Sequence, residues 1–212
     1  MTGLVNGLFL YLAIISYSIP IVFNLKIQKG LIHKNLPFFI LILTNFIFVV
    51  LELIFSNRIQ NSYPIYHVSV FIATILTFAY FIKSGLSPKI ATIFLFLTVG
   101  IFFYETVYLN RIFYNNYILT VFSNVLISLI SLLNLFKLFT NAQENIVDFK
   151  FHFYINTAVF VFNSSAFYVS LFESHIKAED GFLFDIIYPI FCGLIVLQNL
   201  LITAGLWQLK KS

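Results

Sequence analysis

Charged residues are scarce in this chain. Only 9% of its 212 residues are Asp, Glu, Lys or Arg, whereas soluble domains carry roughly 25%. A single Cys excludes an intramolecular disulfide framework and any metal or redox motif built from several Cys residues. Hydrophobic residues make up 60% of the chain, and its mean hydropathy is +0.97. This composition excludes a soluble domain and predicts a protein of the lipid bilayer.

Motifs that would identify an enzyme are also missing. The sequence has no G-x-S-x-G nucleophile elbow, no P-loop and no H-E-x-x-H metal motif. The last apolar stretch has no Lys between Gly181 and Lys210, which excludes a retinal Schiff base there. The basic residues of the chain are scattered along the sequence and form no nucleic-acid-binding patch. We therefore expect neither enzymatic activity nor a cofactor, metal or nucleic-acid ligand.

Seven apolar stretches are each close to the roughly 20 residues needed to cross about 30 Å of hydrocarbon. They cover about residues 4–25, 37–56, 64–82, 90–109, 117–138, 152–173 and 182–208. The sequence therefore predicts an all-α polytopic protein, a seven-transmembrane-helix bundle that forms one domain over residues 1–212, without a soluble domain. The longest connection, about 139–151, has the length of a short interfacial helix.

Proline supports these helix boundaries. Pro37, Pro64 and Pro88 lie at or just before the starts of the second, third and fourth stretches, where the missing N–H costs no hydrogen bond. Pro20 and Pro189 lie inside the first and seventh stretches and predict kinks in those helices.

The Lys and Arg residues between the stretches predict the orientation, because cytoplasmic loops carry an excess of them. Nine lie on one expected side: Lys26, Lys29, Lys34, Lys83, Lys89, Lys137, Lys150, Lys210 and Lys211. Only Arg58, Arg111 and Lys177 lie on the other. We therefore expect the N-terminus outside and the C-terminus in the cytoplasm of a bacterial inner membrane.

Four ionisable side chains are expected at one depth within the spans. Glu52, His67, Glu105 and Asp185 each lie three or four residues from the outer end of their stretch, or about 4–6 Å below the outer boundary at about 1.5 Å per residue. In one interpretation each snorkels to the headgroups. In the other they line a water-accessible pocket or polar network, in which an imidazole near a carboxylate makes a proton-sensitive element. We interpret the four as ligand-binding or proton-binding candidates.

Polar residues recur below this layer at a spacing of seven residues, which keeps the side chains on one helical face. Asn163 is expected at the middle of the membrane, where a ligand pocket would have its floor, and is a further binding candidate. The other asparagines are expected to hydrogen-bond between helices at about 0.6–2 kcal/mol each. They are Asn45, Asn124, Asn134, Asn156 and Asn199.

Three stretches resemble a group of small seven-helix bacterial inner-membrane proteins. They read "PIYHVSVFIATILTFAYF" (residues 64–81), "FHFYINTAVFVFNSSAFYVSL" (151–171) and "LQNLLITAGLWQLKK" (197–211). Members of this group come mainly from Bacteroidota and are often encoded beside sensor histidine kinases. The resemblance implies a sensory or partner-binding role and brings no catalytic residues with it.

A second resemblance is to PQ-loop and SWEET-type transporters, which share this size and helix number. The stretch "YSIPIVFNLKIQKG" (residues 17–30) resembles the motif of their first helix. The Gln expected after the proline is Ile21 here, and the expected second copy, around "SLLNLFKLFTNA", has no proline. A transporter of this type should show the duplicated element.

Three functions remain open on these grounds. The first is a sensor or signalling module whose outward-facing polar pocket binds a small ligand or protons, and whose output passes to a separate partner such as a histidine kinase. The second is a small-solute or proton-coupled transporter with a polar path between the two faces. The third is a structural subunit of a larger membrane complex.

Overall fold

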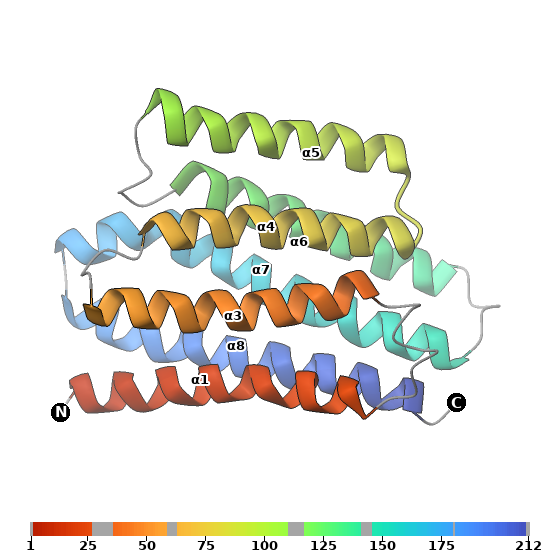
Figure 1. The fold of residues 1–212 in the computed structure, drawn as a ribbon, viewed down its shortest axis with the longest axis horizontal. Helices are drawn as coiled ribbons and strands as arrows, with labels where there is room; N and C mark the ends of the chain where they lie inside the picture. Colours follow the sequence, from red (N-terminus) through yellow and green to blue (C-terminus); the bar gives the residue numbers. More distant parts are fainter. Residues whose placement is uncertain are drawn as a thin grey trace. The chain divides into compact units, whose positions relative to one another are not determined.

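We analysed a computed structural model of the chain, which describes residues 2–26, 36–58, 63–109, 117–140, 146–179 and 181–210. These residues form seven α-helices and one π-helical turn, and no strand occurs among them (Figure 1). The helices are α1 (Thr2–Leu25), α3 (Leu36–Arg58), α4 (Tyr63–Lys83), α5 (Pro88–Phe103), α6 (Tyr117–Thr140), α7 (Ile146–Glu179) and α8 (Gly181–Lys210). The π-helix η1 (Tyr104–Tyr108) directly follows α5. The expected all-α class and the seven helices are confirmed.

Most helix boundaries agree with the apolar stretches to within a few residues. Pro37 and Pro64 are the second residues of α3 and α4, and Pro88 is the first residue of α5, as expected for a residue that cannot donate a backbone hydrogen bond. Pro20 and Pro189 lie inside α1 and α8. The clear differences are the π-turn, which replaces the last residues of the fourth stretch, and α7, which starts six residues earlier and ends six residues later than expected.

Six helical segments of the described chain are long and apolar enough to cross a membrane: 6–25, 36–55, 63–83, 88–108, 118–140 and 186–210. They confirm a multi-pass membrane protein. The stretch at 152–173 was expected as a seventh span, but α7 is not among these segments. His152, Asn156 and Asn163 interrupt its apolar character, so its place as a span stays a prediction. The first residues of α7 come from the segment expected as an interfacial helix, 139–151.

The chain divides into two compact units. Unit 1 comprises residues 1–32 and 124–212, and unit 2 comprises residues 33–123. The boundary lies within α6, so that its first residues, through Ser123, belong to unit 2 and the rest to unit 1.

In unit 1, α8 packs against both α1 and α7. Helices α1 and α8 run parallel, because Ser16 contacts Asn199 and Phe23 stacks on Trp207 about two turns further along both helices. On another side of α8, Gly205 allows α7 to approach closely: a Cβ atom there would lie only 3.2 Å from the Tyr154 Cβ atom. Small residues at helix crossings allow such close packing in membranes.

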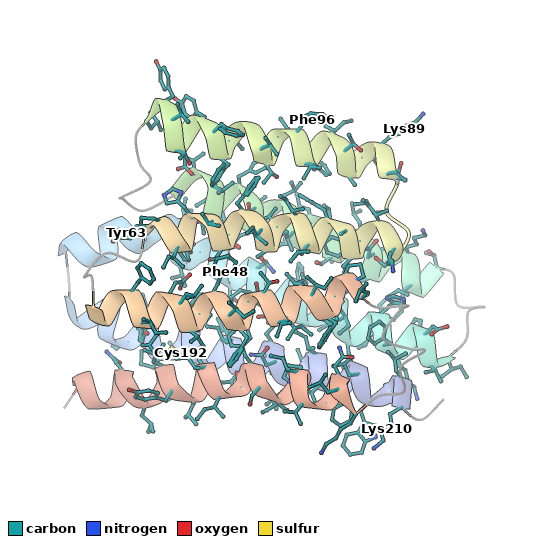
Figure 2. All side chains as sticks on the ribbon, viewed as in Figure 1. Phe48, Tyr63, Lys89, Phe96, Cys192 and Lys210 are labelled. Carbon is teal, nitrogen blue, oxygen red and sulfur yellow. The ribbon has the colours of Figure 1, made fainter. Side chains whose placement is uncertain are left out.

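In unit 2, the consecutive helices α3, α4 and α5 pack in chain order. Phe38 of α3 contacts Tyr80 of α4 with ring centroids 5.2 Å apart, and Phe71 of α4 stacks on Phe102 of α5 at 4.3 Å. The opposite side of α5 is apolar and open: Phe96 is 72% exposed and points away from α4 in Figure 2. Such a surface is expected where a helix faces lipid tails.

Candidate functional site

The most distinctive polar contact in unit 2 is made by Glu105 of η1. Its side chain is fully buried, and its two carboxylate oxygens accept hydrogen bonds from the backbone N–H groups of Ile118 and Leu119, each at 2.9 Å. These N–H groups belong to the first turn of α6, where no carbonyl of the same helix can accept them. The carboxylate therefore caps the N-terminus of α6 and complements its positive dipole end.

The π-turn sets the direction of the Glu105 side chain. The N–H of Leu109 donates to the carbonyl of Tyr104 at 3.0 Å, a bond that spans five residues in place of four. Within this turn Glu105 is buried, whereas Tyr104 is 48% exposed and Tyr108 is 77% exposed, and the two tyrosine rings stack at 5.2 Å. Single π-turns are rare and frequently occur at functional sites.

His67 of α4 lies at the level of Glu105. Helices α4 and α5 are antiparallel, because Phe71 stacks on Phe102 and Phe78 stacks on Phe94 at 6.3 Å. One turn before Phe71 on the same face is His67, and about one turn after Phe102 is Glu105. Both side chains are fully buried. The register thus brings these two predicted site residues to one level of unit 2.

Glu52 of α3 makes a different contact. One of its carboxylate oxygens accepts a hydrogen bond from the Ser69 hydroxyl of α4 at 3.1 Å. Ser69 and His67 are two residues apart and so point to opposite sides of α4. Glu52 therefore lies on the α3 side of α4, and His67 lies on the side that packs against α5. Unit 2 holds three of the four predicted residues, but α4 separates Glu52 from His67.

Two hydroxyls of unit 2 are buried without a hydrogen-bond partner: Thr106 Oγ1 and Ser123 Oγ. Thr106 is next to Glu105, and Ser123 is one turn beyond Leu119 on the same face of α6 and is 2% exposed. Buried hydroxyls without a partner are uncommon and indicate a place where water or another polar group binds. The sequence analysis missed both residues, as well as Ser69, because Ser and Thr are too common in membrane helices to signal a site.

The remaining predicted binding residues lie in unit 1. The Asn163 side-chain amide donates to the carbonyl of Val159 of its own helix at 2.8 Å and is mostly buried. Asp185 belongs to α8, but its side chain lies outside the described part. Whether Asp185 shares a layer with the groups of unit 2 therefore stays a prediction.

The asparagines expected at helix contacts behave in two ways. Asn199 of α8 donates to the Ser16 hydroxyl of α1 at 2.8 Å, which is an interhelical bond as expected. Asn156 instead donates to the carbonyl of His152 in its own helix at 2.7 Å, and its Oδ1 atom is buried without a partner. Asn124 is buried and Asn45 is half-buried, and the backbone carbonyl of Asn124 accepts the Ser128 hydroxyl.

No group of three His, Cys, Asp or Glu residues that could hold a metal ion comes together within the described ranges. Among the described residues, unit 2 buries the Glu105 carboxylate, the His67 ring and the hydroxyl oxygens of Thr106 and Ser123. Comparison with protein-family models, with curated proteins and with solved structures finds no match to this chain.

Proposed function

We propose that this chain is a sensory or signalling module of a bacterial inner membrane that acts through a separate partner protein. Its N-terminus lies outside, so that Glu105 and His67 are near the periplasmic side and the lysine-bearing helix ends are near the cytoplasm. Lys89, at the start of α5, and Tyr63, at the start of α4, lie at opposite ends of unit 2 (Figure 2). The orientation itself rests on the distribution of Lys and Arg residues.

The observation that carries the proposal is the contact between Glu105 and α6. A buried carboxylate that holds the end of a helix gives two arrangements, bound and released, and a ligand that favours one of them shifts the equilibrium. Helix α6 begins in unit 2 and continues in unit 1. A change at its first turn therefore acts on a helix that both units share.

The resemblance to small seven-helix proteins encoded beside histidine kinases supports a kinase as the partner. Lys83, Lys137 and Lys210 each lie in the last turn of a helix and would face that partner in the cytoplasm. Most of the described residues belong to helices that could cross a membrane. This favours a signal that is passed to another protein.

Transport is the second candidate, and the carboxylate and imidazole of unit 2 are its best support, since such groups are common in proton-coupled carriers. A SWEET-type carrier consists of two three-helix repeats. Unit 2 begins after α1 and ends inside α6, so the compact units do not follow that division. A supporting role in a larger complex has no contact among the described residues that favours it.

The test is to isolate the protein in mild detergent and identify what copurifies with it. A histidine kinase whose phosphorylation changes when Glu105, His67 and Glu52 are replaced by uncharged residues supports the proposal. The proposal is contradicted if a kinase copurifies but its activity is unchanged by these replacements. It is also contradicted if no partner copurifies and the protein takes up a solute in proteoliposomes.

A further inference from the structure

We propose that the end of unit 1 at Lys26 and Lys210 binds the phosphate of an anionic phospholipid, and that Trp207 lies beside this lipid. The inference goes beyond the proposed function and does not rest on it. Lys26 directly follows α1, and Lys210 is the last residue of α8. Both lysine side chains are exposed, and Figure 2 shows Lys210 at the C-terminal end of α8.

Helices α1 and α8 bring the two lysines to one level. The helices are parallel neighbours, and Phe23 of α1 stacks on Trp207 of α8 with ring centroids 6.0 Å apart. The N–H of Lys26 donates to the Phe23 carbonyl at 3.2 Å, which adds a further turn to the end of α1. Lys210 likewise lies about one turn after Trp207. Residues three apart share a helix face, so the stacked rings are followed by a pair of lysines on adjacent helices.

This pair of like charges has no counter-ion among the described residues. Helix α1 contains no Asp or Glu, and the only acidic residue of α8, Asp185, is near its other end. Helix α7 brings Asp148 and Lys150 toward the lysine pair, because the Phe151 carbonyl lies close to Gly205 of α8. Asp148 is exposed and forms no ion pair with either lysine of the pair. Ammonium groups at one level repel each other, and an anion bound between them offsets that repulsion.

The lysine pair lies where the apolar part of both helices ends. The candidate spans Asn6–Leu25 and Ile186–Lys210 end at this level. Trp207 is 53% exposed, and Val22 and Leu25 of α1 are exposed as well. Tryptophan gathers at the headgroup level of membranes, and lysine extends its ammonium group to the same level. A phospholipid covers both the apolar side chains and the charges, whereas a soluble anion would contact the lysines alone.

The fluorescence of Trp207 reports on this end of unit 1, because it is the only tryptophan of the chain. The test reconstitutes the full chain into symmetric vesicles that mix phosphatidylcholine with phosphatidylglycerol, one of which carries bromine on its acyl chains. Bromine quenches tryptophan at short range, so the quenching gives the relative affinity of the two lipids beside Trp207. A lysine contributes roughly fivefold to the binding of anionic lipid. The wild type should prefer phosphatidylglycerol about fivefold or more at low salt, and less at about 1 M salt.

Three double variants separate the lysine pair from general surface charge. Lys26→Gln with Lys210→Gln should remove the preference for phosphatidylglycerol. Lys26→Arg with Lys210→Arg keeps both charges and should keep the preference. Lys83→Gln with Lys89→Gln removes the same charge from exposed lysines of unit 2 and should behave as wild type. The salt dependence of the wild type is a further measurement that needs no variant.

Equal quenching of the wild type by both lipids would overturn the inference and would leave the lysines as complements of the helix dipoles. A preference that survives Lys26→Gln with Lys210→Gln would overturn it too, as would an equal loss in the unit 2 variant. If inorganic phosphate abolished the preference at constant ionic strength, the lysines would bind a soluble anion and the lipid proposal would be wrong. These vesicles contain no partner protein, so every result leaves the proposed function to its own test.

Discussion

The interiors of the two units use polar groups differently. Unit 2 buries a carboxylate and an imidazole, Glu105 and His67, and uses the carboxylate to hold a helix end. Unit 1 joins its helices through neutral groups: the Asn199 amide donates to the Ser16 hydroxyl, and Gly205 lets α7 and α8 approach closely. A neutral contact of this kind does not respond to protons or ions. A buried carboxylate does, since its charge and its acceptor capacity change together.

This contrast predicts that polar contacts contribute differently to the stability of the two units. Interhelical hydrogen bonds between neutral side chains contribute modestly in membranes, about 0.6 kcal/mol on average. A buried N–H that loses its acceptor costs about 1–3 kcal/mol. The contacts of Glu105 should therefore dominate, and the neutral contacts of unit 1 should be smaller and indifferent to pH.

The largest effect is expected from Glu105→Ala. It leaves the N–H groups of Ile118 and Leu119 without their acceptor and should lower the free energy of unfolding by about 2 kcal/mol or more. Unfolding in mixed detergent micelles measures it. The control Asp148→Ala removes an exposed carboxylate and should change the free energy of unfolding by less than about 0.5 kcal/mol. Equal effects of the two variants would show that the cap contributes nothing.

Gly205→Leu should come next, because it places a side chain where even a Cβ atom would lie 3.2 Å from Tyr154 Cβ and 3.3 Å from the carbonyl oxygen of Phe151. Overpacking of this kind costs about 1–3 kcal/mol. Gly193→Leu on the same helix is the matched control, since a Cβ atom there meets nothing within 4 Å. If both variants unfold at the same detergent concentration, α7 and α8 do not pack closely at Gly205.

A smaller effect is expected for the bond between Asn199 and Ser16. A double-mutant cycle of Asn199→Leu and Ser16→Ala should give a coupling energy of about 0.6–1.7 kcal/mol. The coupling should be the same at neutral and at acidic pH, because neither side chain titrates. Additive single variants, or a coupling that depends on pH, would remove the contrast between the two units.

The smallest effect is expected for Glu52→Gln. The Gln carbonyl can still accept the Ser69 hydroxyl, and the variant no longer places a charge within the membrane, so the free energy of unfolding should fall by less than about 0.5 kcal/mol, or rise. A loss as large as that of Glu105→Ala would mean that Glu52 carries a charge-dependent contact as well. The two glutamates of unit 2 would then contribute equally to the free energy of unfolding, although Glu52 accepts one hydrogen bond from Ser69 and Glu105 accepts two from α6.

Much of the architecture was predictable from residue patterns. The apolar stretches and Pro37, Pro64 and Pro88 predicted the helices and several of their starts, because hydrocarbon thickness and proline geometry act locally. The π-turn was not predictable, since the sequence from Tyr104 to Tyr108 has no local signal for it. The polar interruptions of α7 were visible in the sequence, yet its apolar residues led to the expectation of a seventh span.

The candidate site was predicted in part. Glu105 and His67 were singled out from their expected depth, and the register of α4 and α5 brings them to one level. That they form a binding site stays a prediction. The cap itself was not foreseen, because Ile118 and Leu119 contribute only backbone N–H groups, which every residue has. Thr106 and Ser123 were missed for a similar reason, since a hydroxyl becomes informative only when its partners are known.

The amino-acid sequence was sufficient to establish a multi-pass helical membrane protein, because the bilayer selects apolar helices by length and composition, which are properties of each segment alone. Which polar groups meet depends on the rotation and register of packed helices. Those are decided by contacts between residues far apart in the chain, such as Phe71 with Phe102 and Asn199 with Ser16. Only the tertiary structure therefore showed that Glu52 accepts a hydrogen bond from a serine hydroxyl and that Glu105 accepts hydrogen bonds from the first turn of α6.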